Sequence, residues 1–347
     1  MGKIFIKKIE IERVRHLKNE EICLGNDDMR HLILTGKNGS GKTSLLDRLS
    51  VFFDSITKHD GIMYYQSKVD SYQSNYNTGL KQSPDLEDER ERKEFLEAAQ
   101  NELKAAKSGL DIEFNVSYAT LNKNFKNGDF IVAYYKDERV LDLIEPKHVT
   151  KVEFQETYGM EDTPSKEFIK YLLDIKMTQA LALQAGKSEK GKRITEWFDH
   201  FEKILQEMYG EDSIKLEFDE DTFHFYVLQQ GRERFGLNEM SRGYAAIMDI
   251  IVDLMMRMER HTEQKFSYDM PGVVLIDEIE THLHLELQKR IMGMLTTLFP
   301  NIQFIVSTHS PFVLNSISNV TIYDLEKKIT VKDGLQNIPY DGIVESY

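Results

Sequence analysis

A run of glycines, one lysine and one threonine separates two apolar segments near the start of the chain. Residues 32–46 read LILTGKNGSGKTSLL, so a strand-like segment precedes the glycines and a helix-like segment follows them. Residues 36–43 match the pattern G-x-x-x-x-G-K-[ST] at every defined position. Glycines there let backbone N–H groups turn inward around a phosphate, and the following helix points its positive end at the same place. The sequence therefore predicts a phosphate-binding loop between a strand and a helix.

Each polar residue of this phosphate loop has an expected task. We expect Lys42 to reach the β- and γ-phosphate oxygens of ATP as a catalytic cation, and Thr43 to supply a hydroxyl ligand to Mg²⁺. A glycine-rich turn without a ligand is the alternative interpretation, which the flanking strand and helix patterns disfavour. The residues expected to bind the nucleotide are Gly36, Asn38, Gly39, Ser40, Gly41, Lys42, Thr43 and Ser44.

Two acids follow a buried strand late in the chain. Residues 273–276 are apolar and precede Asp277 and Glu278. At the carboxyl end of a strand beside a phosphate loop, the first acid can hold Mg²⁺ and the second can act on water as a general base. We therefore expect Asp277 to be a metal ligand and Glu278 the catalytic base. His309 follows another apolar strand, and it is expected to reach the γ-phosphate; on its own it would be an ordinary loop histidine.

The run LNEMSRGY at residues 237–244 directly precedes a segment with an apolar helical face. Ser241 is well placed to cap that helix, and capping is one interpretation of its role. A helix start that carries serine and glycine is also a ready phosphate clamp, which would involve Gly243 as well. If these residues do not reach the phosphate loop of their own chain, they must serve a second chain.

The pattern of apolar residues predicts an α/β fold. The last third of the chain alternates apolar strands with helices, which indicates a mainly parallel sheet covered on both faces. Isoleucines alternate with charged residues in an N-terminal β part within residues 3–35, which we expect to be antiparallel. We expect residues 1–53 and 230–347 to form the nucleotide-binding core and residues 54–229 an inserted helical and β lobe.

Two segments of the predicted lobe differ in composition. Residues 54–83 are polar and rich in tyrosine, and we expect a surface loop or a partly ordered insertion. Residues 85–107 are dense in helix formers of both charges, which indicates a solvated helix or an arm that contacts a partner. The other expected elements are strands at 111–118, 130–135, 149–154, 273–276 and 302–306, a final strand pair at 320–333, a hairpin at 213–228, and helices at 41–53, 165–183, 190–208, 242–260 and 284–298.

The net charge, the cysteine content and the apolar runs of the chain exclude or disfavour several classes of protein. The net charge of −14 argues against a surface that binds nucleic acid along its whole length, although a local basic groove stays possible. The single cysteine, Cys23, excludes an intrachain disulfide and a Cys-x-x-Cys zinc site, and it favours a cytoplasmic location. No apolar run reaches the roughly 18 residues that a membrane helix needs, so no membrane partner is expected.

The order of phosphate loop, Ser-x-Gly signature, Asp-Glu strand and Thr-His switch resembles the ABC-type ATPase head, a P-loop NTPase fold. The runs IDEIETHLH and STHSP are similar to the stand-alone prokaryotic AAA ATPases related to the OLD, RecF and SMC groups, which include many phage-defence ATPases. The resemblance covers nearly the whole chain and implies ATP, Mg²⁺ and a head-to-tail dimer or larger assembly. In that dimer, Ser241 and Gly243 of one chain face a partner site made of Lys42, Thr43, Asp277, Glu278 and His309.

Other positions relate less directly to the family pattern. The resemblance suggests an adenine-side role for Arg15, or for Arg13, in the turn after the first strand. The family carries a glutamine loop, but residues 136–139 after the strand at 130–135 read KDER and contain no glutamine. The signature also departs from the Leu-Ser-Gly-Gly form, because Met240 and a tyrosine replace its ends, which leaves the hydrolysis rate open.

Several functions are compatible with these features. The first is a slow ATPase that regulates a separate effector, a nuclease or a toxin, in prokaryotic antiviral defence. Residues 310–347 are too few for a Toprim nuclease domain, so we expect the damaging chemistry to come from another protein. The second is a DNA-repair head of the RecF or SMC type, and the third is an ATP-dependent scaffold with little turnover. A transporter subunit fits the signature and the IDEIETHLH run least well.

Overall fold

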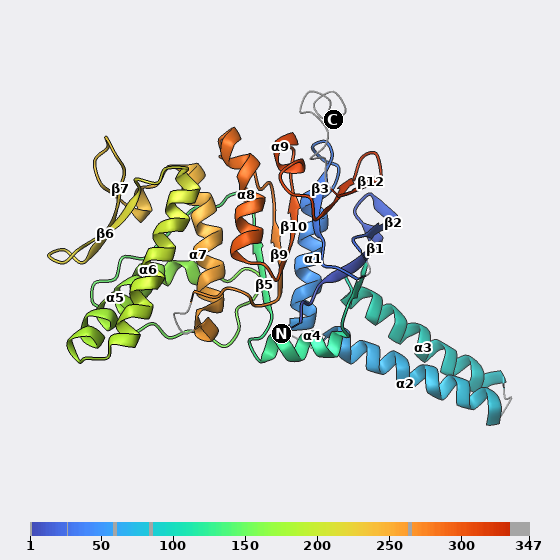
Figure 1. The fold of residues 1–347 in the computed structure, drawn as a ribbon. Coiled ribbons are helices and arrows are strands. Elements are labelled where there is room, and N and C mark those ends of the chain that lie inside the picture. Colours follow the sequence, from blue (N-terminus) through green and yellow to red (C-terminus); the bar gives the residue numbers. More distant parts are fainter. Residues whose placement is uncertain (1, 26, 58–60, 83–85, 263–265, 334–347) are drawn as a thin grey trace.

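The computed structural model describes residues 2–25, 27–57, 61–82, 86–262 and 266–333. Figure 1 shows a central sheet with helices on either side of it and a pair of helices that projects away from this body. Within the described ranges, no helix is both long and apolar enough to cross a lipid bilayer.

The central sheet has six strands in the order β12-β11-β3-β10-β9-β5. The neighbours from β11 to β5 are all parallel, and β12 joins β11 antiparallel. The parallel strands are buried along their whole length and are largely apolar, as expected where helices cover both faces. This confirms the predicted α/β fold. The strands are β3 His31–Thr35, β5 Ile131–Tyr135, β9 Gly272–Ile276, β10 Ile302–Ser307, β11 Val320–Asp324 and β12 Ile329–Lys332.

Successive residues of each central strand pack on opposite faces of the sheet. On β9, Val273 and Leu275 join one buried apolar cluster, which includes the inward face of α1. Val274 and Ile276 join a second cluster, which includes α7 and α8. Helix α1 therefore covers one face of the sheet, and α7 and α8 cover the other. These helices are α1 Lys42–Thr57, α7 Arg242–Thr262 and α8 Leu285–Leu298, and the short α9 Pro311–Leu314 follows β10.

A smaller antiparallel sheet packs on the α1 side of the molecule, with its strands in the order β2-β1-β4. Ile9 of β1 pairs with Ile22 of β2 and with Ile112 of β4. All three side chains are buried in the cluster that includes α1. The predicted antiparallel N-terminal part is therefore confirmed, and it also includes a strand from later in the chain. The strands are β1 Ile6–Val14, β2 Leu17–Cys23 and β4 Leu110–Phe114.

The loop expected within residues 54–83 is instead largely helical. Helices α2 and α3 lie side by side and form the projecting arm in Figure 1. Tyr72 of α2 stacks on Phe95 of α3, with ring centroids 5.9 Å apart. The side of α2 that is turned away from solvent contains tyrosines at helical spacing, Tyr65, Tyr72 and Tyr76. The prediction was wrong because it counted these tyrosines as polar residues. The helices are α2 Gly61–Gln82 and α3 Leu86–Ala106, and α3 matches the helix predicted at 85–107.

A lobe of two helices and a small sheet covers the α7 face. Trp197 of α6 stacks on Phe201 at 5.5 Å, and both lie with Phe168 of α5 in the apolar cluster that includes α7. The predicted helices at 165–183 and 190–208 and the hairpin at 213–228 are confirmed by these elements. They are η1 Pro164–Glu167, α5 Phe168–Gln184, α6 Ser188–Tyr209, β6 Lys215–Asp219, β7 His224–Leu228, β8 Phe235–Gly236 and η2 Leu237–Glu239.

The strand predicted at residues 149–154 does not form. The Val152 N–H donates to Asp174 Oδ2 at 3.1 Å, and Lys151 Nζ donates to the Oδ1 atom of the same carboxylate at 2.6 Å. A side chain of α5, rather than a neighbouring strand, therefore holds this segment. The sequence patterns also missed helix α4, Tyr118–Lys126.

Strands β4 and β5 lie inside the range 54–229 that was expected to form an inserted lobe. Strand β4 nevertheless pairs with β1, and β5 pairs in parallel with β9 at the edge of the central sheet. The chain thus returns to the core between the arm and the α5–α6 lobe. The division of the chain at residues 54 and 229 stays a prediction.

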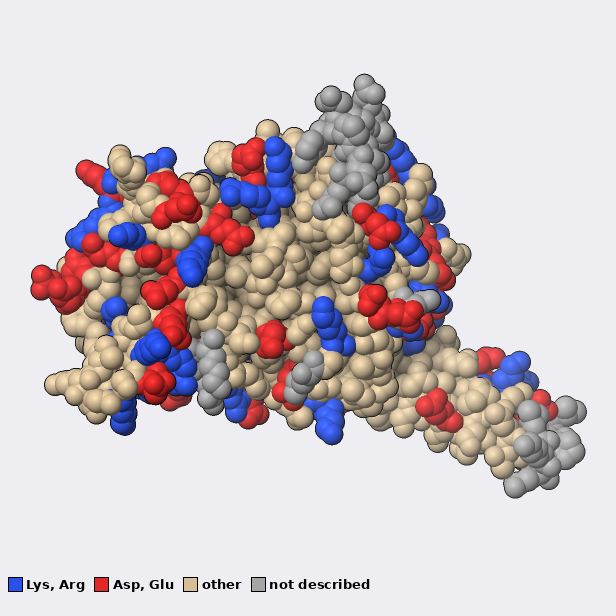
Figure 2. Space-filling model, viewed as in Figure 1, with Lys and Arg blue, Asp and Glu red and all other residues tan. Residues whose placement is uncertain are grey.

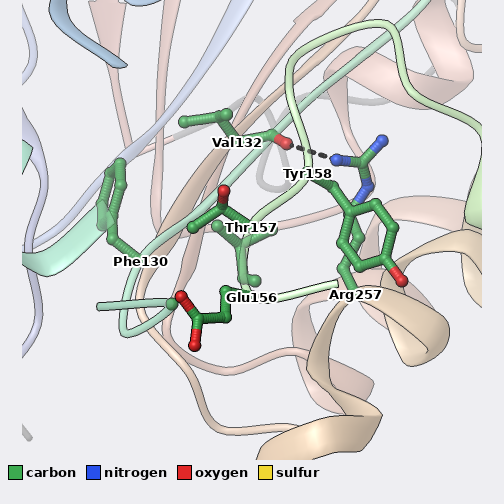
Figure 3. A pocket seen from close by; sticks show the side chains of 8 residues that line it. Phe130, Val132, Glu156, Thr157, Tyr158 and Arg257 are labelled. Atoms are coloured by element: carbon green, nitrogen blue, oxygen red, sulfur yellow. Dashed lines mark hydrogen bonds between the residues drawn. The ribbon is translucent and has the colours of Figure 1, made fainter. Parts of the chain in front are cut away.

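Buried polar contacts tie α7 to β5. Asp253 accepts from Arg257 Nε at 2.7 Å and from Tyr135 Oη at 2.7 Å. Arg257 Nη1 also donates to the Val132 carbonyl at 2.9 Å, beside a pocket that Tyr158 helps to line (Figure 3). That pocket measures only about 10 Å³, so it has no room for a nucleotide. Because loss of one partner would leave a buried charge, this network fixes α7 against the sheet.

Asp249 lies one helical turn before Asp253 on α7. Its Oδ1 atom accepts from Ser165 Oγ at 3.1 Å. Burial, followed by the nearby negative charge of Asp253, raises the pKa of Asp249 to about 6 from an ordinary value of 3.8. The folded chain therefore keeps this proton at pH values where the unfolded chain has lost it. The stability that protonated Asp249 contributes is complete below about pH 4 and is lost as the pH rises through about 6.

We expect Asp249→Asn to remove this pH-dependent loss, because asparagine keeps an acceptor for Ser165 but does not ionise. The free energy of unfolding of the variant, relative to the unmodified chain, should rise by up to about 3 kcal/mol between pH 4 and pH 6.5. Urea unfolding of both proteins across this range measures the difference. If the difference in unfolding free energy stayed constant with pH, the raised pKa of Asp249 would be contradicted.

Candidate functional site

The phosphate loop joins β3 to α1 with a backbone that only glycine adopts readily. Gly36, Gly39 and Gly41 have φ angles of 128°, 82° and 103°. A side chain at any of these positions would be strained, and a Cβ on Gly41 would meet Leu17 Cδ1 at 3.1 Å. Helix α1 begins at Lys42, so the free N–H groups of its first turn lie next to the loop. The local sequence thus forms the expected cradle for an anion.

Lys42 folds back into this cradle. Its Nζ donates to the carbonyls of Gly36 at 2.8 Å and Lys37 at 3.2 Å, and the residue is 5% exposed. Burial lowers the pKa of Lys42, and the nearby carboxylates of Glu278 and Asp277 oppose that shift. Because β10 pairs in parallel with both β3 and β9, the lysine lies at the same sheet edge as the predicted acidic residues, although more than 200 residues separate them in sequence.

The other polar residues of the loop differ in exposure. Ser40 Oγ is buried and has no hydrogen-bond partner in the structure. Thr43 and Asn38 are exposed, whereas Ser44 is buried. Buried hydroxyl groups normally have a hydrogen-bond partner. An anion bound in the loop, which is rich in oxygen atoms, would supply the partner that this hydroxyl lacks.

The acidic residues follow β9 and are held by β10. Asp277 is 2% exposed and accepts a hydrogen bond from Ser307 Oγ. The Glu278 N–H donates to the same Oγ at 2.8 Å. The sequence prediction missed Ser307, although a hydroxyl directly after a buried apolar strand was a signal for it. Ser307 fixes both acids to the neighbouring strand.

A second contact joins the acidic turn to the predicted switch histidine. Glu280 accepts from Thr308 Oγ1 at 2.6 Å and from the His309 N–H. His309 lines a cavity of about 380 Å³ together with Gly36 and Lys37. The fold therefore brings His309 next to the phosphate loop, and Glu280 orients its backbone, while its contact with the γ-phosphate stays a prediction. The sequence prediction did not identify Glu280.

Ser241 and Gly243 lie at the start of α7, on the face of the sheet opposite α1. The Ser241 carbonyl accepts from the Ala245 N–H at 2.9 Å, and its side chain is exposed. Gly243 is buried, and a Cβ at that position would lie 2.6 Å from the carbonyl oxygen of His282. The first turn of α7 thus touches the turn after Glu278, while Ser241 faces solvent.

The turn between β1 and β2 lies against the phosphate loop. Arg15 has a φ angle of 53° and is exposed. The neighbouring His16 Nε2 lies 3.0 Å from the Ser40 carbonyl oxygen. The structure therefore places Arg15 one residue from a contact with the loop, and its role beside adenine stays a prediction.

Magnesium, when bound, would neutralise phosphate charge and polarise the γ-phosphate. Among the described residues, no group of three or more His, Cys, Asp or Glu side chains forms a metal cluster. Mg²⁺ commonly takes only one or two carboxylates and completes its shell with phosphate oxygens and water. The oxygen donors Asp277 and Thr43 fit such a site.

The fold and this arrangement of loop, acids and histidine define a P-loop nucleotide-binding protein of the α/β class. The model of the family described as "AAA domain, putative AbiEii toxin, Type IV TA system" matches residues 32–315, and the chain belongs to this family. The match spans the loop, the start of α7, the acidic turn and His309.

The chain is also similar to several known proteins. The chain is 29% identical over 197 residues to "Retron Ec83 probable ATPase" of Escherichia coli, which covers 50% of this chain and 36% of that protein. It is 24% identical over 330 residues to "Septu protein PtuA" of Bacillus mycoides (strain KBAB4), covering 90% of this chain and 39% of that protein. The matched part is thus less than two fifths of the length of each relative. The solved "SMC head domain from Thermotoga maritima" aligns with a TM-score of 0.41 and 13% identity, covering 92% of this chain and 94% of that one.

We expect Gly243→Ala to lower the free energy of unfolding by about 1–3 kcal/mol, because the new Cβ would collide with the His282 carbonyl. Gly293→Ala is the matched control on α8, where a Cβ meets nothing within 4 Å. Alanine there should raise the stability by about 0.5–1 kcal/mol through its better helix propensity. Urea unfolding of the two variants measures both effects, and equal shifts would refute the close contact.

Proposed function

We propose that this chain binds ATP with Mg²⁺ and hydrolyses it slowly to ADP and phosphate. One observation carries the proposal: β10 pairs in parallel with both β3 and β9, so the phosphate loop with Lys42 and the turn with Asp277 and Glu278 lie at the same edge of the sheet. Loop backbone and Lys42 hold the phosphates, and Thr43 and Asp277 hold the metal ion.

In this proposal, Glu278 is the general base. Its carboxylate takes a proton from a water molecule, whose oxygen bonds to the γ-phosphorus as the bond to the β-phosphate oxygen breaks. Lys42 stabilises the charge that develops on the transferred phosphoryl group, and His309 contacts the γ-phosphate from the opposite wall.

We further propose that two chains close head to tail around ATP. Ser241 is exposed at the start of a helix on the face of the sheet opposite α1. A helix start that carries serine and glycine suits a phosphate, and the partner's phosphate loop supplies one. Each site is therefore completed by the second chain.

For biological role, we propose that the ATP-gated assembly regulates a separate effector, a nuclease or a toxin, in prokaryotic antiviral defence. The similarity to a retron ATPase and to a Septu protein supports this role. The alternatives are a DNA-repair head of the RecF or SMC type and an ATP-dependent scaffold, and the following experiments distinguish them.

We expect Glu278→Gln to lower the ATP turnover number by about 10²–10⁴-fold, because glutamine accepts no proton from water. Glu94→Gln, on the exposed face of the arm, is the matched control and should keep the full rate. Phosphate release, measured with and without duplex DNA, reports the rate. If the Glu278→Gln variant hydrolysed ATP as fast as the parent, the role of Glu278 as general base would be refuted. Strong stimulation by DNA would favour the repair head, and absent turnover in the parent would favour the scaffold.

The head-to-tail arrangement predicts complementation between two inactive chains. Lys42→Ala lacks a working phosphate loop, and Ser241→Arg lacks a working signature. In a mixed dimer, the intact loop of the second chain meets the intact signature of the first. An equal mixture should therefore recover about a quarter of the parental sites, given random pairing of the two chains. If the signature served its own chain, the mixture would stay as inactive as each variant alone.

A further inference from the structure

Arg139 is a buried arginine next to the acidic turn. It lies four residues after the end of β5, in the segment KDER, and only 7% of its surface is exposed. Strand β5 pairs with β9 in parallel, with Tyr135 opposite Ile276. The chain leaving β5 therefore emerges directly beside the turn that carries Asp277 and Glu278.

The guanidinium of Arg139 binds backbone carbonyls of three successive residues in that turn. Nη1 donates to the Asp277 carbonyl at 2.6 Å, and it also donates to the Lys136 carbonyl at 3.0 Å. Nη2 donates to the carbonyls of Glu278 at 2.9 Å and Ile279 at 3.4 Å. A planar fork with two donor arms can hold this set, whereas the single ammonium of a lysine cannot span it.

The backbone of Glu278 needs such support. Glu278 has a φ angle of 44°, a backbone conformation that residues other than glycine and asparagine seldom adopt. Such strain persists only where surrounding contacts over-determine the conformation. The Glu278 N–H is held by Ser307 Oγ on one side, and its carbonyl is held by Arg139 on the other. These two contacts fix the backbone from which the Glu278 carboxylate extends, and Thr281 Oγ1 donates to its Oε2 atom at 3.3 Å.

Charge also links Arg139 to the helix that begins with the signature. Burial lowers the pKa of Arg139, and the carboxylates of Glu280, Asp249 and Asp277 oppose this shift in that order. Asp249 belongs to α7, whereas Glu280 and Asp277 belong to the acidic turn. Carboxylates of both the acidic turn and α7, the helix that Ser241 precedes, therefore favour the charged form of the guanidinium.

We propose that Arg139 is a positioning residue for ATP hydrolysis: it holds the Glu278 backbone so that the carboxylate faces the attacking water. This inference rests on the proposed ATPase function and deepens it. It also assigns a role within residues 136–139, which contain no glutamine.

The test uses Arg139→Lys and Arg139→Met, alone and combined with Glu278→Gln. For each single variant we expect the turnover number to fall by about 10–100-fold, because a displaced base loses its alignment. The dissociation constant for ATP, measured with a fluorescent analogue, should change less than about threefold, since the hydrogen bonds of Arg139 go to residues 136 and 277–279 and not to the phosphate loop. In the Glu278→Gln background, either Arg139 substitution should lower the turnover number no further, because the carboxylate that Arg139 positions is already absent.

A matched control separates positioning from folding. Arg257 is a second buried arginine that binds backbone carbonyls, those of Val132, Gly159 and Asp162, away from the acidic turn. Arg257→Lys should lower the melting temperature by at least as much as Arg139→Lys. Below both melting temperatures, its turnover number per ATP-binding chain should stay within about twofold of the parent.

The outcomes distinguish the two proposals. If Glu278→Gln keeps the parental rate, the proposed function fails at the base itself. If Glu278→Gln abolishes turnover and Arg139→Lys keeps the full rate, the positioning role alone is overturned. An equal loss from Arg139→Lys in both backgrounds, or an equal loss of turnover in Arg257→Lys, would likewise show that Arg139 does not act through Glu278.

Discussion

Parallel pairing of β3, β10, β9 and β5 is the constraint on which the rest of the site depends. In a parallel sheet, the carboxyl ends of neighbouring strands meet at one edge. The register places Ser307 opposite Leu34 and Tyr135 opposite Ile276. The phosphate loop after β3, the hydroxyl that ends β10, the acids after β9 and the arginine after β5 therefore converge, although they come from four distant parts of the chain.

Polar contacts between these strand ends convert proximity into a defined geometry. Ser307 binds both Asp277 and the backbone of Glu278, and Glu280 binds the residues that follow β10. Arg139 closes the arrangement from the β5 side. The contacts that Asp277 makes with Ser307 and Arg139 are buried, so a group that lost its partner there would carry the full cost of desolvation. This cost makes the acidic turn resist alternative conformations.

The same sheet separates the two halves of the proposed nucleotide site. Helix α1 and the phosphate loop lie on one face, and α7 with Ser241 lies on the other. Gly243 nevertheless touches the His282 backbone, so the start of α7 and the acidic turn are packed together. In the proposed head-to-tail dimer, a movement of the signature would therefore displace the acidic turn.

The sequence by itself determined the residues that act through local backbone chemistry. The glycines and Lys42 form their loop within eight residues. Asp277 and Glu278 are recognisable because they directly follow an apolar run that is typical of a buried parallel strand. Only the tertiary structure decided which residues support them. The partners of Arg139 in the acidic turn lie about 140 residues away in sequence, and α2 is stabilised as Tyr72 stacks on Phe95 of α3. Such contacts depend on strand order and helix pairing, which no local pattern of residues encodes.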